Sequence, residues 1–201
     1  DRVNRSTTSA QSFSVISPDL TRGNGGVDGS VYGTITALAV AKSNSAVLYA
    51  GTDDGRVWIT RNTGGSWTEI TAGLPTRWIT RIAVDPGNAD LAYVTVSGFR
   101  NGDVAAHVFR TSNGGSTWQD ISGNLPDAPV SDIVIDPRDA GILYVATDVG
   151  VFASADAGAS WSPVGTGLPL VPISDIDAVV SGSSTVLTVA TFGLSMYRAT
   201  V

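Results

Sequence analysis

The sequence predicts an all-β protein built from repeated four-stranded units, the architecture of a β-propeller. Two observations favour this fold. An eight-residue frame ending in Trp or Phe occurs four times, and these aromatic residues follow one another after 54, 51 and 43 residues. Short apolar runs separated by turn signals fill the space between the copies. Spacings of this size, with several strands per unit, are typical of propeller blades.

The frame begins with Ser or Thr and carries Asp or Asn at its third position. Full copies span residues 60–67, 111–118 and 154–161, and a weaker copy spans residues 6–13. Asp or Asn can bond its own backbone, Gly tolerates positive φ, and the aromatic residue is a large apolar anchor. Each copy is therefore predicted to be a hairpin turn. The residues assigned to these three roles are Asn62, Gly65 and Trp67; Asn113, Gly115 and Trp118; and Asp156, Gly158 and Trp161.

The frame resembles the Asp-box, or BNR repeat, of sialidases, xyloglucan-degrading glycosidases, sortilin-type receptors and a photosystem II assembly factor. The full copies keep every defining position, with Asn-for-Asp and Ser-for-Thr exchanges. The weaker copy keeps Ser6 and Ser12 and has Phe13 in place of Trp. The chain is most similar to the C-terminal parts of bacterial exported Asp-box proteins. The resemblance implies propeller blades whose boxes join the third and fourth strands at the outer rim, as structural turns away from the central site.

The strands are expected in chain order. The chain opens with residues 3–6 and 13–16, followed by an exposed glycine-rich connection over residues 21–33. The first full unit has strands at 35–40, 47–51, 56–60 and 67–71, with an Asp-Gly hairpin turn at 52–55. The second has strands at 79–84, 91–96, 106–111 and 118–121, and the third at 131–135, 142–146, 151–154 and 161–164. The last has strands at 173–180, 185–191 and 194–199, without a box.

These strands predict one propeller domain or part of one. Its units are residues 1–20 as the end of a blade, 31–78, 79–130 and 131–172 as successive blades, and 173–201 as an incomplete last blade. The total of 17 strands allows two arrangements. Residues 13–16 could pair with residues 194–199 and close a ring of four blades. Alternatively, the chain is half of a seven- or eight-bladed propeller, which we favour. Because an open half exposes strand edges, it predicts a homodimer or a missing N-terminal half.

The composition excludes several function classes. The net charge is −6 without a basic cluster, which argues against nucleic-acid binding. The chain has no cysteine for disulfide or thiol chemistry, and His107 as its single histidine makes a zinc site implausible. No cofactor and no membrane span are expected. Because the chain begins at Asp1, an upstream part could have been removed or omitted. A secreted, periplasmic or cell-surface location in a bacterium is expected from the resemblance.

A ligand site is expected on the face opposite the boxes, where the loops between units and the turns between second and third strands meet. The candidate catalytic residues there are Asp53, Asp103 and Asp148, because glycoside hydrolysis needs two carboxylates on either side of the bond. Asp53 and Asp148 also fit an ordinary role as turn residues. The candidate ligand-binding residues are Arg77, Trp78, Phe99 and Arg100. For Trp78, packing between blades is an equally good interpretation.

Two functions remain open. One is a non-catalytic extracytoplasmic binding or scaffold module that recognises a protein or glycan through its loop face. The alternative is a fragment of a glycoside hydrolase-like propeller acting on a plant or microbial polysaccharide. A sialidase is rejected, because that family carries an Arg-Ile-Pro element and a Tyr-Glu pair, whereas this chain lacks Arg-Ile-Pro and has Glu69 as its single Glu.

Overall fold

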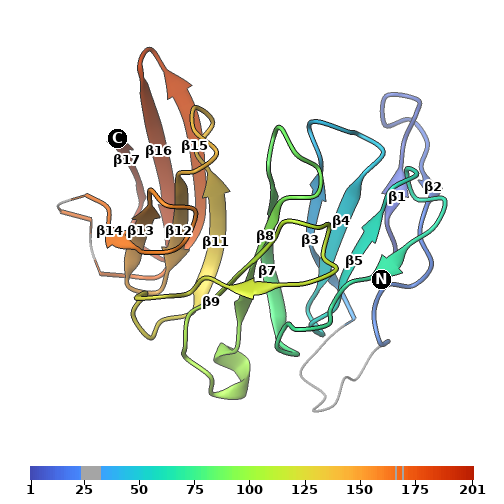
Figure 1. Ribbon diagram of the computed structural model, residues 1–201, viewed down its shortest axis with the longest axis horizontal. Coiled ribbons are helices and arrows are strands. Elements are labelled where there is room, and N and C mark those ends of the chain that lie inside the picture. Colours follow the sequence, from blue (N-terminus) through green and yellow to red (C-terminus); the bar gives the residue numbers. More distant parts are fainter. Residues whose placement is uncertain (24–32, 166, 169) are drawn as a thin grey trace.

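The computed structural model describes residues 1–23, 33–165, 167–168 and 170–201, which contain 17 β-strands and one short 3-10 helix. Figure 1 shows the sheets side by side in a row along the longest axis of the molecule. This confirms the all-β propeller architecture of about four blades. Most of the glycine-rich connection predicted at residues 21–33 lies outside the described residues.

Four of the sheets are blades, numbered here in chain order. Blade 1 consists of β3 (Ile35–Val40), β4 (Leu48–Thr52), β5 (Val57–Thr60) and β6 (Thr68–Glu69). Blade 2 consists of β7 (Trp78–Val84), β8 (Ala92–Ser97), β9 (His107–Thr111) and β10 (Gln119–Asp120), with the helix η1 (Phe99–Asn101) between β8 and β9. Blade 3 consists of β11 (Val130–Ile135), β12 (Leu143–Thr147), β13 (Gly150–Ser154) and β14 (Ser162–Pro163). Blade 4 has three strands, β15 (Ile173–Ser181), β16 (Ser184–Thr191) and β17 (Met196–Thr200).

Each blade is an antiparallel meander, and the first strands β3, β7, β11 and β15 are neighbours along the row. In every one of these strands the pairing register shifts after its first paired residues, which marks a bulge. A hydroxyl residue stands at each bulge, and we call this set the hydroxyl ladder: Thr36, Thr80, Ser131 and Ser174. The first three donate to a carbonyl of the next blade, Thr36 to Ile79 (2.6 Å), Thr80 to Val130 (2.9 Å) and Ser131 to Ile173 (2.5 Å). Ser174 instead donates to Ala190 of its own blade (3.1 Å).

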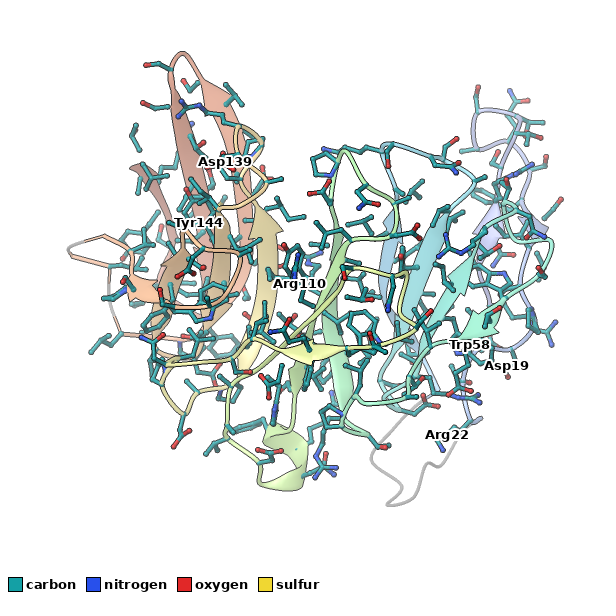
Figure 2. All side chains as sticks on the ribbon, viewed as in Figure 1. Asp19, Arg22, Trp58, Arg110, Asp139 and Tyr144 are labelled. Atoms are coloured by element: carbon teal, nitrogen blue, oxygen red, sulfur yellow. The ribbon has the colours of Figure 1, made fainter. Side chains whose placement is uncertain are left out.

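Side chains occupy the space between neighbouring blades (Figure 2), and the buried clusters there consist of apolar residues. The full copies of the eight-residue frame are called boxes from here on, and the tryptophan at the end of each one adds a polar link. The indole nitrogens donate to a carbonyl of the preceding sheet, Trp67 to Ile16 (2.8 Å), Trp118 to Ile70 (2.7 Å) and Trp161 to Ile121 (2.8 Å). Each box thus attaches its blade to the one before it, and the indole N–H remains satisfied although Trp161 is 3% exposed.

The box turns are held by their own side chains. Asp156 accepts hydrogen bonds from the Ser160 amide (2.9 Å) and the Ser154 hydroxyl (2.7 Å), and Ser154 accepts one from the Gly158 amide (2.8 Å). These bonds lower the pKa of Asp156 to about 2, with the Ser160 hydroxyl contributing most. Asn62 and Asn113 accept the equivalent amide bonds in their boxes.

One glycine assignment in the boxes was wrong. Gly115 and Gly158 have φ of 84° and 94°, as expected, but in the first box the positive φ of 92° belongs to Gly64 and not to Gly65. Gly64 follows Asn62 by two positions, as Gly115 follows Asn113. A Cβ on Gly64 would lie 2.4 Å from the carbonyl oxygen of Ile16, so the close approach to the preceding sheet also requires glycine there.

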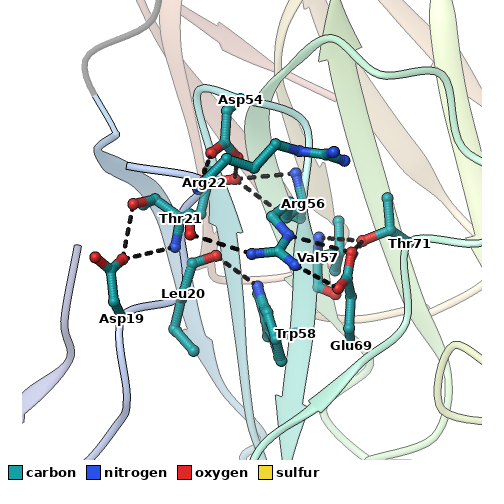
Figure 3. A network of polar contacts seen from close by, with 11 residues as sticks. Asp19, Leu20, Thr21, Arg22, Asp54, Arg56, Val57, Trp58, Glu69 and Thr71 are labelled. Atoms are coloured by element: carbon teal, nitrogen blue, oxygen red, sulfur yellow. Dashed lines mark hydrogen bonds and ion pairs between the residues drawn. The ribbon is translucent and has the colours of Figure 1, made fainter. Parts of the chain in front are cut away.

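The segment Asp19–Arg22 is fixed to blade 1 by a polar network (Figure 3). Trp58 donates to the Leu20 carbonyl (2.7 Å), and Arg56 donates to the Thr21 carbonyl (3.1 Å) while pairing with Glu69 (2.8 Å). The Arg22 amide donates to Asp54 (2.5 Å). Leu20 is fully buried beneath this network.

The N-terminal strands do not close a ring with blade 4. β1 (Asn4–Arg5) pairs with β2 (Ser14–Val15), and this two-stranded sheet lies at the opposite end of the row from β17 (Figure 1). The alternative in which residues 13–16 pair with residues 194–199 of the same chain is therefore not formed. The reason is that Val3, Ile16 and Leu20 belong to one apolar cluster with Ala50 of blade 1.

Candidate binding depression on the loop face

An open depression of about 590 Å³ lies where the four first strands begin. Every blade contributes to its lining, either from the first strand or from the loops beside it. Its lining residues are Thr36, Trp78, Thr80, Ser97, Phe99, Pro129, Val130, Ser131, Asp148, Pro172, Ser174 and Phe192. We call it the loop-face depression. Three of the residues predicted for the site, Trp78, Phe99 and Asp148, meet in it.

Three aromatic side chains give the depression its apolar surface. Phe99 is 63% exposed and Phe192 is 77% exposed, and exposed apolar side chains that share one depression are typical of binding sites. Trp78 is half-buried, and the Arg100 guanidinium lies 4.1 Å from the centre of its ring. This cation–π contact occupies one face of the indole. Trp78 therefore lines the depression, and Arg100, which lies outside the lining, holds its ring.

The hydroxyl ladder forms the floor. All four ladder residues line the depression, and their hydroxyl protons are donated to backbone carbonyls. A hydroxyl whose proton is engaged still has lone pairs to accept a hydrogen bond. The floor therefore presents a row of acceptors to any ligand with hydroxyl or amide donors.

Asp148 is the one acidic side chain among the described residues that line the depression. Burial raises the pKa of its carboxyl, and its amide donates to the Pro129 carbonyl (3.2 Å). A carboxyl with a raised pKa can donate a hydrogen bond when protonated, or accept one when ionised.

Asp103 lies outside the lining and holds the loop that carries Phe99. Its carboxylate is 2.9 Å from His107 Nε2 and 3.8 Å from Arg77 Nε, and its amide donates to the Gly98 carbonyl (3.1 Å). The hydrogen bond with His107 lowers the pKa of Asp103. Arg77, predicted to bind ligand, is thus engaged with this loop.

Asp53 also lies outside the lining. It is 5% exposed and accepts a hydrogen bond from the Thr34 amide (2.8 Å). Its neighbour Asp54 accepts from Arg22 and Thr52. Both carboxylates therefore bind backbone or hydroxyl groups of blade 1 and of the segments that precede it, as turn residues do.

Next to the hydroxyl ladder along the first strands, one charged link joins three blades. Arg81 of β7 donates to both carboxylate oxygens of Asp132 of β11, at 2.5 Å and 2.6 Å, and also pairs with Asp175 of β15. These residues immediately follow the ladder hydroxyls in their strands. The hydrogen bonds to Asp132 raise the pKa of Arg81 further, so the guanidinium stays charged.

Sequence reasoning missed Phe192 and the hydroxyl ladder. The ladder does have a signal, because each first strand carries the pair Ile-Thr, Val-Ser or Ile-Ser near its start. Phe192 has one as well, because it lies in the turn between the predicted strands 185–191 and 194–199, and such turns were expected on the loop face. Across the residues that the structure describes, no group of His, Asp and Glu has the arrangement to hold a metal ion. No helix among those residues has the length and apolar character to cross a membrane.

The fold and this depression define a β-propeller whose loops frame an open, aromatic-lined mouth. Solved structures agree with the fold. An ancestral GH74 enzyme matches with a TM-score of 0.71 and 22% identity over 98% of this chain and 27% of its own. The GH74 enzyme of Niastella koreensis matches with a TM-score of 0.64 and 19% identity over 90% of this chain and 29% of its own.

A third similar structure is YCF48 bound to D1 peptide, with a TM-score of 0.55 and 15% identity over 82% of this chain and 54% of its own. The chain thus spans under a third of the length of the two GH74 enzymes. No protein-family model and no curated protein matches the chain.

Proposed function

We propose that this chain is a non-catalytic binding propeller that recognises a glycan through the loop-face depression. The observation that carries the proposal is the combination of Phe99 and Phe192, both mostly exposed, with the acceptor floor of the hydroxyl ladder. Sugar rings present an apolar face and a rim of hydroxyl donors, and such a wall and floor match both. The similarity of the fold to GH74 enzymes adds support by analogy.

Binding is favoured over hydrolysis by the number of carboxylates. Glycoside hydrolysis uses a pair of them, roughly 5–10 Å apart, and Asp148 is the one acidic residue in the described lining. The alternative function, part of a glycoside hydrolase-like propeller, is favoured by one observation, the raised pKa of Asp148, since a general acid needs such a shift. Its second carboxylate would come from outside the depression.

We further propose that the protein works outside the cytoplasm. The support is the resemblance of its boxes to those of exported bacterial proteins.

The test is calorimetric titration with xyloglucan and mixed-linkage β-glucan oligosaccharides. We expect binding that F99A and F192A each weaken about tenfold or more, because each removes an exposed aromatic contact. V180A is the control, since Val180 is also mostly exposed (53%) but lies near the end of β15 away from the depression. Absence of binding to the whole panel would refute the proposal.

Hydrolysis is measured in the same samples as the release of reducing ends. We expect none from the wild-type chain. Release that disappears in D148N would show that the protein is an enzyme and would replace the binding proposal with the alternative.

A further inference from the structure

The contact between blades 3 and 4 lacks a side chain that the other contacts have. Trp118 packs in one apolar cluster with Val57, Ile70 and Leu74. Trp161 packs in the next cluster with Val108, Ile121 and Leu125. The equivalent cluster contains Val151, Val164 and Leu168 but no tryptophan among the described residues.

A cavity lies at this position. It has a volume of about 130 Å³ and is lined by Val151, Val164, Leu168, Leu187 and Tyr197, among others. Val164 is equivalent in the repeat to Ile16, Ile70 and Ile121, whose carbonyls accept hydrogen bonds from the box tryptophans. We call this cavity the third slot. Beside it, β17 is an edge strand that pairs with β16 alone, whereas β5, β9 and β13 each pair with a fourth strand.

The other end of the chain carries the missing parts. Phe13 ends the N-terminal copy of the frame, in the position of the tryptophan, and it is 63% exposed. It leads directly into β2, a short strand that pairs with β1 over two residue pairs, Asn4 with Val15 and Arg5 with Ser14. A side chain suited to the third slot and a strand suited to the β17 edge therefore lie together at the far end of the row.

Blade 1 and blade 4, at the two ends of the row, also have side chains and backbone groups that would fit together. Leu38 of β3 is 52% exposed, whereas the residues at its position in the other blades, Ile82, Ile133 and Ile176, are 1–5% exposed because a preceding blade covers them. Ser174 is the ladder hydroxyl that has no following blade among the described residues. The carbonyls that accept from the other ladder hydroxyls belong to the residue just before each bulge, namely Ile79, Val130 and Ile173, and Ile35 has this position in β3. A blade 4 placed before blade 1 would cover Leu38 and bring Ser174 to the Ile35 carbonyl.

We propose that two copies of this chain join end to end, with Phe13–Ile16 of each copy adding as the fourth strand beside β17 of the other and Phe13 filling the third slot. The two junctions are identical, as two-fold symmetry requires, and every exposed strand edge between copies is then covered. In this arrangement β2 of one copy pairs with β17 of the other copy, in place of its pairing with β1 of its own chain. Each copy contributes three complete blades and shares in two composite ones, giving a ring of eight.

Light scattering after size exclusion tests the assembly. We expect a mass of twice 20.6 kDa that falls towards 20.6 kDa on dilution. F13A should raise the dimer dissociation constant at least tenfold, and F13W should lower it at least tenfold, since indole restores the N–H that the Val164 carbonyl can accept. The matched control is F99A, equally exposed at 63%, which should leave it unchanged.

A dimer with a dissociation constant of about 1 μM would be almost fully formed at about 100 μM. A chain that stays monomeric up to that concentration would overturn the proposal. So would a dimer that responds to F99A but to neither Phe13 substitution.

A cross-link places Phe13 directly. The chain has no cysteine, so in a dimer of the variant F13C/L168C each of the two junctions can form one disulfide, between the thiol introduced at position 13 of one copy and that at position 168 of the other. We expect a covalent dimer under oxidising conditions, and each single variant to remain uncross-linked through this contact. A disulfide within one chain, giving a cross-linked monomer, would show closure on itself and overturn the two-copy assembly.

Discussion

The box glycines offer a quantitative test of how the blades are joined. Gly158 has φ of 94°, and a Cβ there would lie 2.4 Å from Ile121 Cδ1 and 3.0 Å from Ile121 Cβ. The left-handed backbone costs an L residue about 1–2 kcal/mol, and displacing a packed side chain costs about 1–3 kcal/mol. The lower chain entropy of Ala in the unfolded state offsets about 0.4–1 kcal/mol. We therefore expect G158A to lower the free energy of unfolding by about 1–5 kcal/mol, with about 3 kcal/mol at the middle of the range.

Two other glycines separate the contributions. Gly165 has φ of 80° with nothing within 4 Å of a Cβ, so G165A isolates the backbone strain and should cost about 1 kcal/mol. Gly65 lacks positive φ, and a Cβ there would lie 3.1 Å from Asn62 Nδ2, so G65A should cost less than about 1 kcal/mol. Urea unfolding followed by tryptophan fluorescence measures all three. The reasoning fails if G158A and G165A lie within about 0.5 kcal/mol of each other.

Three further predictions concern single polar contacts. W161F should lower the free energy of unfolding in urea by about 1–3 kcal/mol, because it leaves the Ile121 carbonyl without its 2.8 Å donor. An unchanged urea midpoint would show that this hydrogen bond adds no stability. The folded-state pKa of Asp156 lies below its unfolded value near 3.8, so its stabilisation is present above pH 4 and is lost as the pH falls towards 2. D156N should remove this part of the acid dependence, measured as the urea midpoint at pH 5 and pH 2.5, and an identical acid response in both proteins would contradict it. D132N should lower the free energy of unfolding by about 2–3 kcal/mol, because it leaves Arg81 beside a buried neutral group. D175N changes a carboxylate that is 58% exposed and should lower it by less than about 1 kcal/mol. Equal losses of stability in the two variants would contradict this prediction.

The features that sequence reasoning predicted correctly are local ones. The strand meander and the turns of the boxes depend on residues within a few positions of one another, so Asn113, Gly115 and Trp118 could be assigned from their spacing alone. Gly64 was missed because two glycines stand side by side, and the choice between them depends on contact with Ile16 of another sheet.

The candidate site was harder, because its walls come from different blades. Trp78, Phe99 and Asp148 could be placed on one face from the order of the loops. The burial of Asp53 could not, since its partner, the Thr34 amide, comes from the connection before β3. The acceptor role of the ladder hydroxyls likewise depends on carbonyls in the next blade, which no local pattern reveals.

The link from Arg81 to Asp132 and Asp175 has a consequence for how the array comes apart. In most repeat arrays each unit contacts only its neighbours, so the ends fray independently of the middle. Arg81 reaches past blade 3 to blade 4, and Asp132 also accepts from the Ile176 amide (3.0 Å). Opening of blade 4 therefore disturbs the charge balance of blade 2. In hydrogen exchange, the amides of β7, β11 and β15 should consequently lose protection as one cooperative group, while β3, which lies outside this link, opens separately.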